Sequence, residues 1–213
     1  MLNREGGSML HEMRTYTIRI EPGGVRELER RFGNAIDIRL KYSRLGGFFH
    51  TLSGEMSQVV HIWPYENLKD RAESRAAANR DDSNRWPPGI GELFEKQEVE
   101  ILTPAPFMRP LEPQKIGRLW ELSWVEYPPN SVDQALSAYE KAMPDRDKQY
   151  PVIGCWTVDI GADLGRIYTL MPYRDWEHRN EVREAQSWPP QSDVPALATG
   201  SKLLEPSWFS TLQ

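Results

Sequence analysis

The spacing of apolar and polar side chains predicts a β-α-β-β-α-β order of elements in the first half of the chain. Residues 9–20 alternate and are rich in Thr, Tyr and Ile, which is typical of a strand. Residues 25–42 place apolar side chains near helical spacing, with arginines and acids on the opposite face. We further predict strands at 48–52 and 57–63 joined by a turn at 53–56, a helix that opens at 64–67, and a last strand at 94–102. This order is that of the ferredoxin-like unit.

The second half of the chain predicts the same order again. Its elements are a strand at 119–127, a helix at 131–143, a hairpin of 153–159 with 166–171, a helix at 174–186 and a last strand at 202–208. Residues 108–115 carry two prolines and no periodicity, so we interpret them as a linker.

Short sequence landmarks support a duplication, because they recur in one order in both halves. They are 47–51 with 154–158, 61–65 with 169–173, Arg71 and Arg75 with Arg179 and Arg183, 86–88 with 188–190, and 104–107 with 206–209. A period of about 100 residues is too long for a solenoid and indicates two copies of a small domain. We place these domains at 9–107 and 117–210, the second being a degenerate copy.

The predicted sheets imply that the two copies pack together. A four-stranded sheet with helices on one face leaves its other face apolar and open, and a second sheet is the usual cover. A domain of about 100 residues also buries only a modest core by itself. We therefore predict an α+β protein in which two tandem ferredoxin-like domains cover each other within one chain.

Composition excludes several classes of protein. With 39% hydrophobic and 27% charged residues, the 213-residue chain has the composition of an ordinary soluble protein, and its net charge of −5 argues against nucleic acid as a partner. The single cysteine, Cys155, excludes an internal disulfide framework. No apolar run approaches the roughly 20 residues of a membrane span, and residues 1–8 form a polar, glycine-rich lead-in. We expect a soluble, cytoplasmic protein that does not bind membranes.

Four segments of the first copy resemble the NIPSNAP family. They are 12–16 (EMRTY), 47–51 (GFFHT), 58–65 (QVVHIWPY) and 101–107 (ILTPAPF). The resemblance is strong over about 10–107 and degenerate over 117–209. It implies a dimeric α/β barrel, made here by one chain acting as a pseudo-dimer. The same superfamily holds antibiotic-biosynthesis monooxygenases, haem-degrading enzymes, small isomerases and dehydratases, so the resemblance implies no single activity.

Candidate site residues come from the predicted hairpin of the first copy. If its turn pairs Leu52 with Ser57, then His50 lies opposite Val59 and Phe48 opposite His61. The strand period of two then places His50, His61 and Trp63 on one face. Arg14 and Tyr16 share a face of the first strand, which neighbours the third strand in this fold. Either the Arg14 side or the Thr15 side of that strand adjoins His61.

The differences between the copies suggest where a site could lie. His50, His61, Trp63, Arg14 and Tyr16 correspond to Thr157, Thr169, Met171, Ser123 and Val125. We therefore predict one pocket, in the first copy, that binds a small-molecule substrate. Its predicted catalytic residues are His50, His61, Arg14 and Tyr16, since histidine can move a proton and arginine can hold an anion. Its predicted substrate-binding residues are Trp63, Phe48, Arg71 and Arg75.

Some of these residues also have a structural interpretation. Arg71 and Arg75, like Arg179 and Arg183, are one helical turn apart, where ion pairs with acids such as Glu66 are the usual role. Ligand anchoring is the alternative for these arginines. Cys155 aligns with Phe48 in a strand, which favours a small buried thiol over a nucleophile.

The sequence leaves three functions open. The first is a cofactor-independent enzyme of bacterial secondary metabolism, acting as an oxygenase, isomerase, cyclase or dehydratase, with no metal or other cofactor. The second is a non-catalytic binding or scaffold protein with a filled barrel and no pocket. The third is a haem or metal binder, in which His50 and His61 would be joined by Glu12 or Asp37. No HxH, HExxH or CxxC spacing supports that ligand set. A homo-oligomer is compatible with all three.

Overall fold

A computed structural model describes residues 9–20, 23–128 and 130–213, and its elements follow one order twice. In the first unit these are β1 (Leu10–Ile18), α1 (Gly24–Leu40), β2 (Gly47–Ser53), β3 (Gln58–Tyr65), α2 (Leu68–Asn79) and β4 (Phe94–Pro104), with a short 3-10 turn, η1 (Gly91–Leu93), before β4. In the second unit they are β5 (Leu119–Glu126), α3 (Val132–Gln149), β6 (Gly154–Ile160), β7 (Arg166–Tyr173), α4 (Trp176–Ala185) and β8 (Ala198–Pro206). The predicted lead-in at 1–8 and part of the predicted turn at 21–24 lie outside the described residues.

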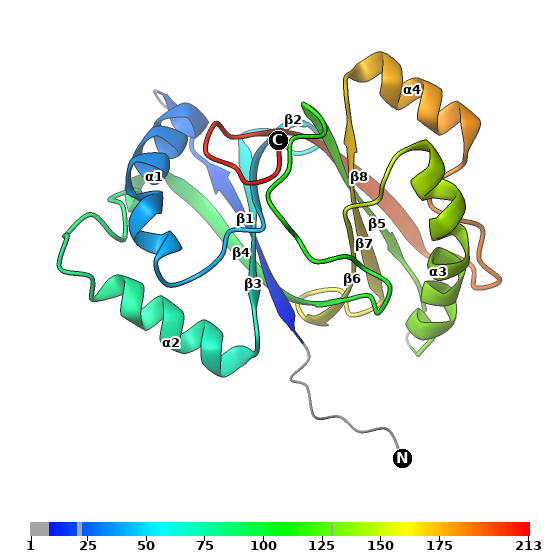
Figure 1. Cartoon of the computed structure of the whole chain (residues 1–213), viewed down its shortest axis with the longest axis horizontal. Coiled ribbons are helices and arrows are strands. Elements are labelled where there is room, and N and C mark those ends of the chain that lie inside the picture. The colour runs from blue at the N-terminus through cyan, green and yellow to red at the C-terminus, as the bar shows by residue number, and fades with distance from the viewer. Residues whose placement is uncertain (1–8, 21–22, 129) are drawn as a thin grey trace.

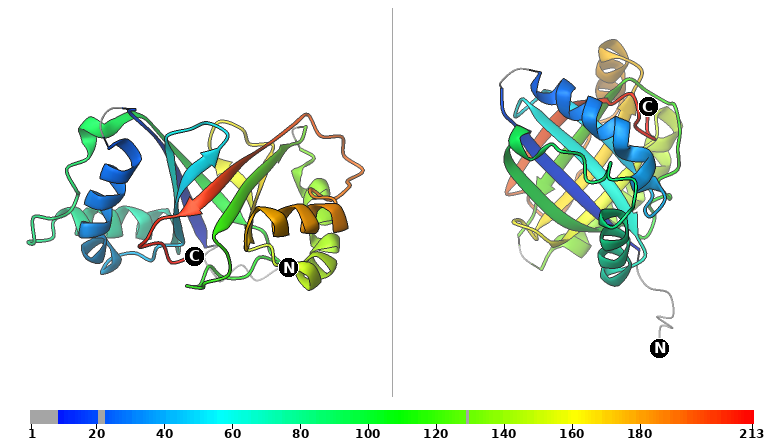
Figure 2. Two further views of the ribbon diagram at one scale, coloured as in Figure 1. Left: turned by 90° about the horizontal axis from the view of Figure 1, so that it is seen from above. Right: turned by 90° about the vertical axis from the view of Figure 1, so that its left-hand side faces the viewer.

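The eight strands close into one antiparallel barrel. Its strand order is β1-β3-β2-β8-β5-β7-β6-β4, so each unit supplies four neighbouring strands. The units join at two seams, β2 with β8 and β4 with β6. Helices α1 and α2 lie on one side of the barrel and α3 and α4 on the opposite side, as Figures 1 and 2 show. The protein is therefore an α+β fold whose arrangement matches two tandem ferredoxin-like units, while the boundaries 9–107 and 117–210 stay a prediction.

Alternation along the strands separates an inner core from two outer cores. Inside the barrel, side chains of both units pack together and fill the middle of the interior, including Phe49, Trp120 and Trp156. Outside it, each sheet packs against its own helices, around Phe32 and Phe48 in the first unit and around Tyr139 and Trp188 in the second. The middle of the interior is thus filled, while a cavity of about 280 Å³ is lined in part by the inward-facing residues Met13, Leu122 and Tyr168.

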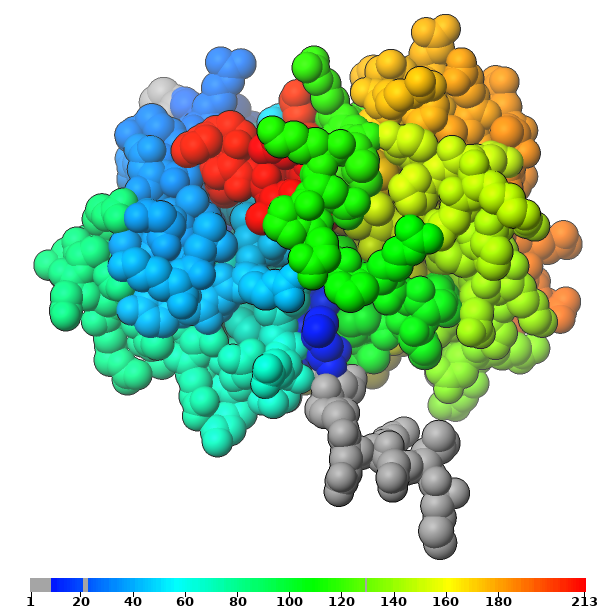
Figure 3. All heavy atoms as spheres, viewed as in Figure 1, coloured from blue at the N-terminus to red at the C-terminus, as the bar shows by residue number. Residues whose placement is uncertain are grey.

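The last segment of each unit packs against the other unit. The backbone N–H of Ala105 donates to Cys155, and that of Ser207 donates to Phe48, which is the same contact on the two sides of the duplication. Phe209 then stacks on Phe32 in the outer core of the first unit. The C-terminal segment lies against α1 and the linker in Figures 1 and 3. Neither unit therefore has a complete outer core without the other.

One helix glycine permits this contact. A Cβ on Gly33 of α1 would come within 2.3 Å of the Trp208 ring and 2.7 Å of Phe209. Because real Cβ atoms do not approach other atoms so closely, only glycine lets the C-terminal segment lie this near to α1.

Predicted boundaries differ from the observed ones by up to six residues, and three of these differences have a clear physical cause. The helix predicted at 131–143 continues through Pro144 to Gln149, because fully buried Arg146 ties its last turns to the sheet. The strand predicted at 202–208 is β8, which begins at Ala198 and ends at Pro206. Its first residues are mostly exposed and show no apolar alternation, but they pair with β5. The helix predicted to open at 64–67 begins at Leu68, where Asn67 caps it by accepting a hydrogen bond from the Asp70 N–H at 2.9 Å.

None of the helices in the described part of the chain is both long and apolar enough to cross a membrane.

Candidate functional site

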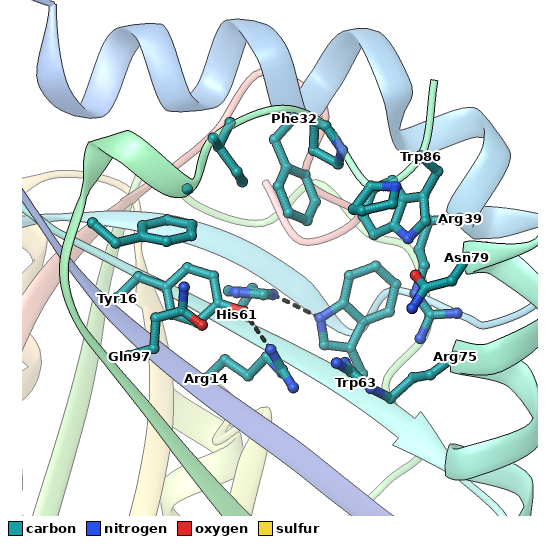
Figure 4. Close-up of a pocket in the computed structure, with 15 residues that line it drawn as sticks. Arg14, Tyr16, Phe32, Arg39, His61, Trp63, Arg75, Asn79, Trp86 and Gln97 are labelled. Atoms are coloured by element: carbon teal, nitrogen blue, oxygen red, sulfur yellow. Dashed lines mark hydrogen bonds between the residues drawn. The ribbon is translucent and has the colours of Figure 1, made fainter. Parts of the chain in front are cut away.

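A cavity of about 380 Å³ lies between the sheet and the helices of the first unit, within the size range of small-molecule sites. Its wall is formed by side chains from β1, α1, β3, α2, the 86–91 loop and β4 (Figure 4). The lining residues are Arg14, Tyr16, Phe32, Arg39, His61, Trp63, Arg75, Asn79, Trp86, Pro87, Pro88, Ile90, Gly91, Phe94 and Gln97.

The strand register explains why the site faces the helices. Phe48 pairs with His61 and His50 with Val59, as the predicted hairpin requires. On the other edge of β3, Arg14 of β1 pairs with His61, so the Arg14 side of β1 adjoins the histidine rather than the Thr15 side. Because Phe49 points into the barrel, its neighbours along the strand point outward.

His61 is held as a neutral hydrogen-bond donor. The Trp63 indole N–H, which can only donate, lies 2.7 Å from His61 Nδ1, so the imidazole proton sits on Nε2. His61 is buried, and Nε2 has no hydrogen-bond partner among the described residues. Burial lowers the pKa of His61 well below the usual value for histidine, and the charges of Arg14, Arg75 and Arg39 lower it further. His61 is therefore suited to donating a hydrogen bond and unsuited to accepting a proton.

Aromatic rings fix the orientation of this imidazole. Phe48 stacks on it with ring centroids 4.9 Å apart, while Tyr16 and Phe32 meet it edge-on at 4.8 and 5.6 Å. Arg14 donates a hydrogen bond to the Tyr16 hydroxyl (Figure 4). The predicted residues His61, Arg14, Tyr16 and Trp63 thus come together at one wall.

Glu12, beside Arg14, is the buried carboxylate of this unit. Its oxygens lie 2.6 Å from Arg14 Nε, 2.8 Å from Arg71 and 3.8 Å from Arg75. Burial opposes ionisation, but hydrogen bonds and charges from the three arginines outweigh it and lower the pKa of the Glu12 carboxyl. The acid predicted to pair with the arginines, Glu66, was therefore the wrong one.

Arg39 on α1 is a cavity residue that the sequence pattern did not reveal. It is only 2% exposed, donates to the Tyr65 hydroxyl at 2.7 Å, and lies over the Trp63 ring at 4.9 Å. No carboxylate among the described residues is within ion-pair distance of it. Its spacing along α1 resembled that of the other arginines on the polar face. Its recurrence as Arg146 in the second unit was the signal that could have identified it.

Three predicted residues lie outside the cavity lining. His50 contacts Glu29 of α1 through Nδ1 at 2.9 Å and Glu205 of β8 through Nε2 at 3.2 Å, and these contacts raise the pKa of its imidazole, mainly through the Glu29 hydrogen bond. Phe48 stacks on the His61 ring but does not line the cavity. Arg71 binds Glu12, whereas Arg75 binds Glu12 and also lines the cavity.

The ligand set considered for a metal is not brought together. His50 is engaged by two glutamates, the Nδ1 of His61 by Trp63, and Glu12 by three arginines. Asp37 is engaged with Arg85 on the surface. Within the described ranges, no group of three His, Cys, Asp or Glu side chains could hold a metal ion. Cys155 is buried as predicted, and burial raises the pKa of its thiol, which disfavours a nucleophilic role.

The second unit keeps the carboxylate and its arginines but fills the space beside them. Glu121 accepts hydrogen bonds from Arg179 at 3.0 Å and Arg183 at 2.7 Å. The Trp188 indole, whose counterpart is Trp86, donates to the Thr169 hydroxyl at 3.1 Å. Arg146 lies over the Trp188 ring at 5.7 Å. Trp188 and Arg146 therefore pack together where their first-unit counterparts border a cavity.

Comparison with known proteins identifies the family. The NIPSNAP family model matches residues 11–109 and 122–195, so the chain belongs to the NIPSNAP family, as the four sequence segments indicated. The mouse Protein NipSnap homolog 3B is 26% identical over 207 residues, covering 87% of this chain and 81% of that protein.

Solved structures of the same overall fold cover the whole barrel. A Fusobacterium nucleatum protein provisionally named a monooxygenase matches with a TM-score of 0.65 and 7% identity, covering 94% of this chain and 93% of that one. A Lactobacillus acidophilus protein with the same provisional name matches with a TM-score of 0.58 and 13% identity, covering 94% of both chains. At these identities the likeness shows the fold alone.

Proposed function

We propose that the first-unit cavity is the active site of a cofactor-independent enzyme that stabilises an oxyanion on a small organic substrate. The observation that carries this proposal is the state of His61, a neutral imidazole that lines the cavity and whose buried Nε2–H has no hydrogen-bond partner in the described structure. A substrate oxygen would reach this donor by displacing a neighbouring side chain such as Tyr16. A preorganised N–H donor in a water-poor site stabilises negative charge on oxygen more strongly than water does.

The proposed role of His61 differs from the proton transfer expected from sequence. Because Nδ1 is occupied by the Trp63 indole and burial lowers the pKa of the ring, His61 would act as an electrophile rather than as a base. Neutral histidine has this role in other enzymes. Arg14, whose guanidinium contacts the Tyr16 hydroxyl, would add positive charge beside the same oxygen.

The oxyanion role suits the reaction types expected from the family resemblance. Cofactor-independent oxygenation, isomerisation, cyclisation and dehydration can all begin when an enolisable or phenolic substrate loses a proton and charge develops on oxygen. No Asp or Glu is among the residues that line the cavity, so the substrate proton would pass to water or a buffer base, and the protein would act mainly by stabilising the anion that forms. The barrels provisionally named monooxygenases share this fold, and oxygenation is one of the reactions compatible with it.

The non-catalytic alternative required a filled barrel and no pocket. The middle of the barrel interior is filled, but the first unit carries a cavity outside it. His11 in the barrel interior has an unpaired Nε2 of the same kind within the described structure, so the position of His61 on a cavity wall, together with its unpaired N–H, is what favours a catalytic role.

The proposal can be tested by following the exchange of carbon-bound hydrogen for deuterium, even when the final product of the reaction is not identified. Anthrone, 2-tetralone and acetophenone would be incubated with the protein in D₂O and followed by NMR, with oxygen uptake recorded in parallel. We expect faster exchange of at least one compound. His61→Leu should lower that rate by about 10²–10³-fold, the usual effect of removing an oxyanion donor.

Two further variants make the experiment specific. His61→Gln keeps an N–H donor and should retain part of the rate, whereas Thr169→Val at the corresponding position of the second unit should leave the rate within about twofold of wild type. The proposal is wrong if no compound exchanges faster than in buffer, or if His61→Leu keeps the full rate in a folded protein.

A further inference from the structure

We infer that the ligand of this cavity is an organic anion with a flat apolar body, whose charged group binds between Arg39, Arg75 and Arg14. The inference rests on the proposed function for the location of the site and extends it to the chemical class of the ligand. Charge balance, the burial of Arg39, the aromatic wall and the contrast with the second unit each support it.

Charge around the cavity is unbalanced in favour of cations. Arg14, Arg39 and Arg75 line it, and Arg71 lies behind Glu12. Glu12 is the only carboxylate that forms ion pairs with any of these arginines among the described residues. Four guanidinium groups thus face one carboxylate, and a bound anion would reduce this excess.

Arg39 is a buried arginine without a carboxylate partner among the described residues, as Arg146 is in the second unit, but Arg39 borders a cavity that an anion could enter. Arg39 is almost fully buried, its partners are the neutral Tyr65 hydroxyl at 2.7 Å and the Ser74 carbonyl at 3.4 Å, and burial lowers the pKa of its guanidinium. A buried charge without an opposite charge is costly, and a charge-assisted hydrogen bond to an anion offsets that cost. Arg39 also lies on the cavity wall, where a ligand can reach it.

Figure 4 shows Arg39, Asn79 and Arg75 on the same side of the Trp63 indole. Their donors can converge on one carboxylate or phenolate, since a guanidinium binds planar oxyanions through two parallel hydrogen bonds. Asn79 adds an amide that can donate to the same group. The polar groups therefore define one end of the cavity.

The rest of the wall fits a flat apolar body. Phe32 and Trp86 meet edge-on with ring centroids 5.2 Å apart, and Tyr16 meets Phe94 at 4.8 Å. Pro87, Pro88 and Ile90 complete this side. Trp86 is only half-buried, so its ring has room for an additional aromatic contact.

The second unit shows what the same arginine does without a ligand space. Arg146, the counterpart of Arg39, is covered by Trp188, and Ser123 stands where the first unit has Arg14. Ser123 forms a hydrogen bond with Thr169 rather than presenting a charge. The first unit therefore combines an additional cation with an open wall at the same place, which is the combination that an anionic ligand requires.

Paired probes of equal shape test the charge requirement. Benzoate, cinnamate and 2-naphthoate would each be titrated against their primary amides, with quenching of tryptophan fluorescence and calorimetry as readouts. We expect at least one carboxylate to bind about tenfold or more tightly than its amide. Arg75→Gln and Arg14→Ser should each weaken carboxylate binding by about 10-fold, and Arg39→Met by about 10–100-fold, with amide binding unchanged.

The second unit supplies matched controls for these variants. Arg146→Met and Arg183→Gln remove the corresponding arginines and should leave carboxylate affinity within about twofold of wild type. If Arg39→Met does not fold, the Arg75→Gln and Arg14→Ser variants still decide the outcome, because both arginines are partly exposed. Equal affinity for carboxylates and amides, no binding by either series, or equal losses from the second-unit variants would each overturn the inference.

The two proposals fail separately. If carboxylates and amides bind equally well but His61→Leu still slows deuterium exchange, only the proposed class of ligand is overturned. Carboxylate binding that depends on Arg39 and Arg75, without any exchange activity, would overturn the oxyanion chemistry and leave an anion-binding site.

Discussion

The two units of this protein build the same electrostatic framework and use it differently. In each, a fully buried glutamate on the first strand is neutralised by two arginines from the second helix, and a further arginine lies on the first helix. In the second unit Trp188 fills the neighbouring space. In the first unit the counterpart of Trp188 is Trp86, which is only half-buried. His61 stands at the position of Thr169, and a cavity remains beside it. The comparison shows that the two second-helix arginines and the first-helix arginine are common to both units, whereas the open space, His61 and Arg14 distinguish the first unit.

The framework itself should be equally important in both units. Glu12→Gln and Glu121→Gln each remove two or three charge-assisted contacts between a buried carboxylate and partly exposed arginines, at about 1.5–3 kcal/mol each, so each should lower the free energy of unfolding by about 3–5 kcal/mol. Urea unfolding at pH 7.5 measures both. A loss in only one unit would show that the frameworks are not equivalent.

Truncation of the paired tryptophans should separate the filled space from the open one. Trp188→Ala removes a buried ring from a packed core and should cost about 3–4 kcal/mol, whereas Trp86→Ala removes a half-buried ring that already borders a cavity and should cost about 1–2 kcal/mol. Thermal and urea unfolding provide the comparison. Carboxylate binding should be lost in Trp86→Ala and kept in Trp188→Ala, and the reverse pattern would refute the assignment of the site.

A third comparison concerns the barrel interior, where His11 of β1 occupies the position that Trp120 has in β5. His11 is buried and accepts a hydrogen bond from the Trp156 indole at 2.8 Å, and burial with the charge of Arg44 lowers the pKa of His11 to about 4. Between about pH 4 and 6.5 the unfolded chain binds a proton at this site and the folded protein does not, so stability falls as pH falls.

Substitution of His11 should remove that part of the pH dependence. We expect wild type to lose up to about 3 kcal/mol between pH 7 and pH 4 from this group alone, and His11→Gln to show a correspondingly flatter profile in urea unfolding. An unchanged slope in His11→Gln would mean that His11 takes up its proton over the same pH range in the folded and unfolded states.

The smallest effect should come from His50, whose counterpart is Thr157. Because Glu29 and Glu205 raise the pKa of His50, its ion pairs stabilise the fold fully below about pH 6.5 and lose this effect as pH rises through the folded pKa. His50→Gln should therefore cost about 0.5–1 kcal/mol at pH 6 and almost nothing at pH 9.

His50 also provides a negative control for the site. Deuterium exchange and carboxylate binding should stay at wild-type levels in His50→Gln, because this histidine joins α1 to β8 outside the cavity. A large loss of either at constant stability would make His50 a functional residue after all.

Local patterns predicted the elements that are amphipathic and missed those whose stability comes from distant partners. The hairpin register was predicted correctly, because the turn at 53–56 fixes which residues of the two strands lie opposite each other. The start of β8 was missed because its first residues are largely exposed and are held by backbone hydrogen bonds to β5. The end of α3 was missed because Pro144 suggested a stop, whereas burial of Arg146 maintains the last turns.

The candidate site was predicted in part for the same reason. Strand periodicity placed His61, Trp63, Arg14 and Tyr16 on connected faces, and the structure brings them to one wall. His50 shares that face but lies one step further along the strand, beside Glu29. Arg39 was missed because a helix can place an arginine against solvent or against a sheet, and only the contact between α1 and Trp63 decides between them.

The sequence alone determined the duplication, the element order, the family and the face on which the first-unit residues lie, because each is written in local periodicity or in matched landmarks. Tertiary structure decided that Glu12 rather than Glu66 pairs with the arginines, that Arg39 is buried without a carboxylate, and that the space beside Arg39 is open while Trp188 fills the corresponding space beside Arg146. These outcomes depend on side chains far apart in the chain, whose charges and volumes interact only after the barrel has closed.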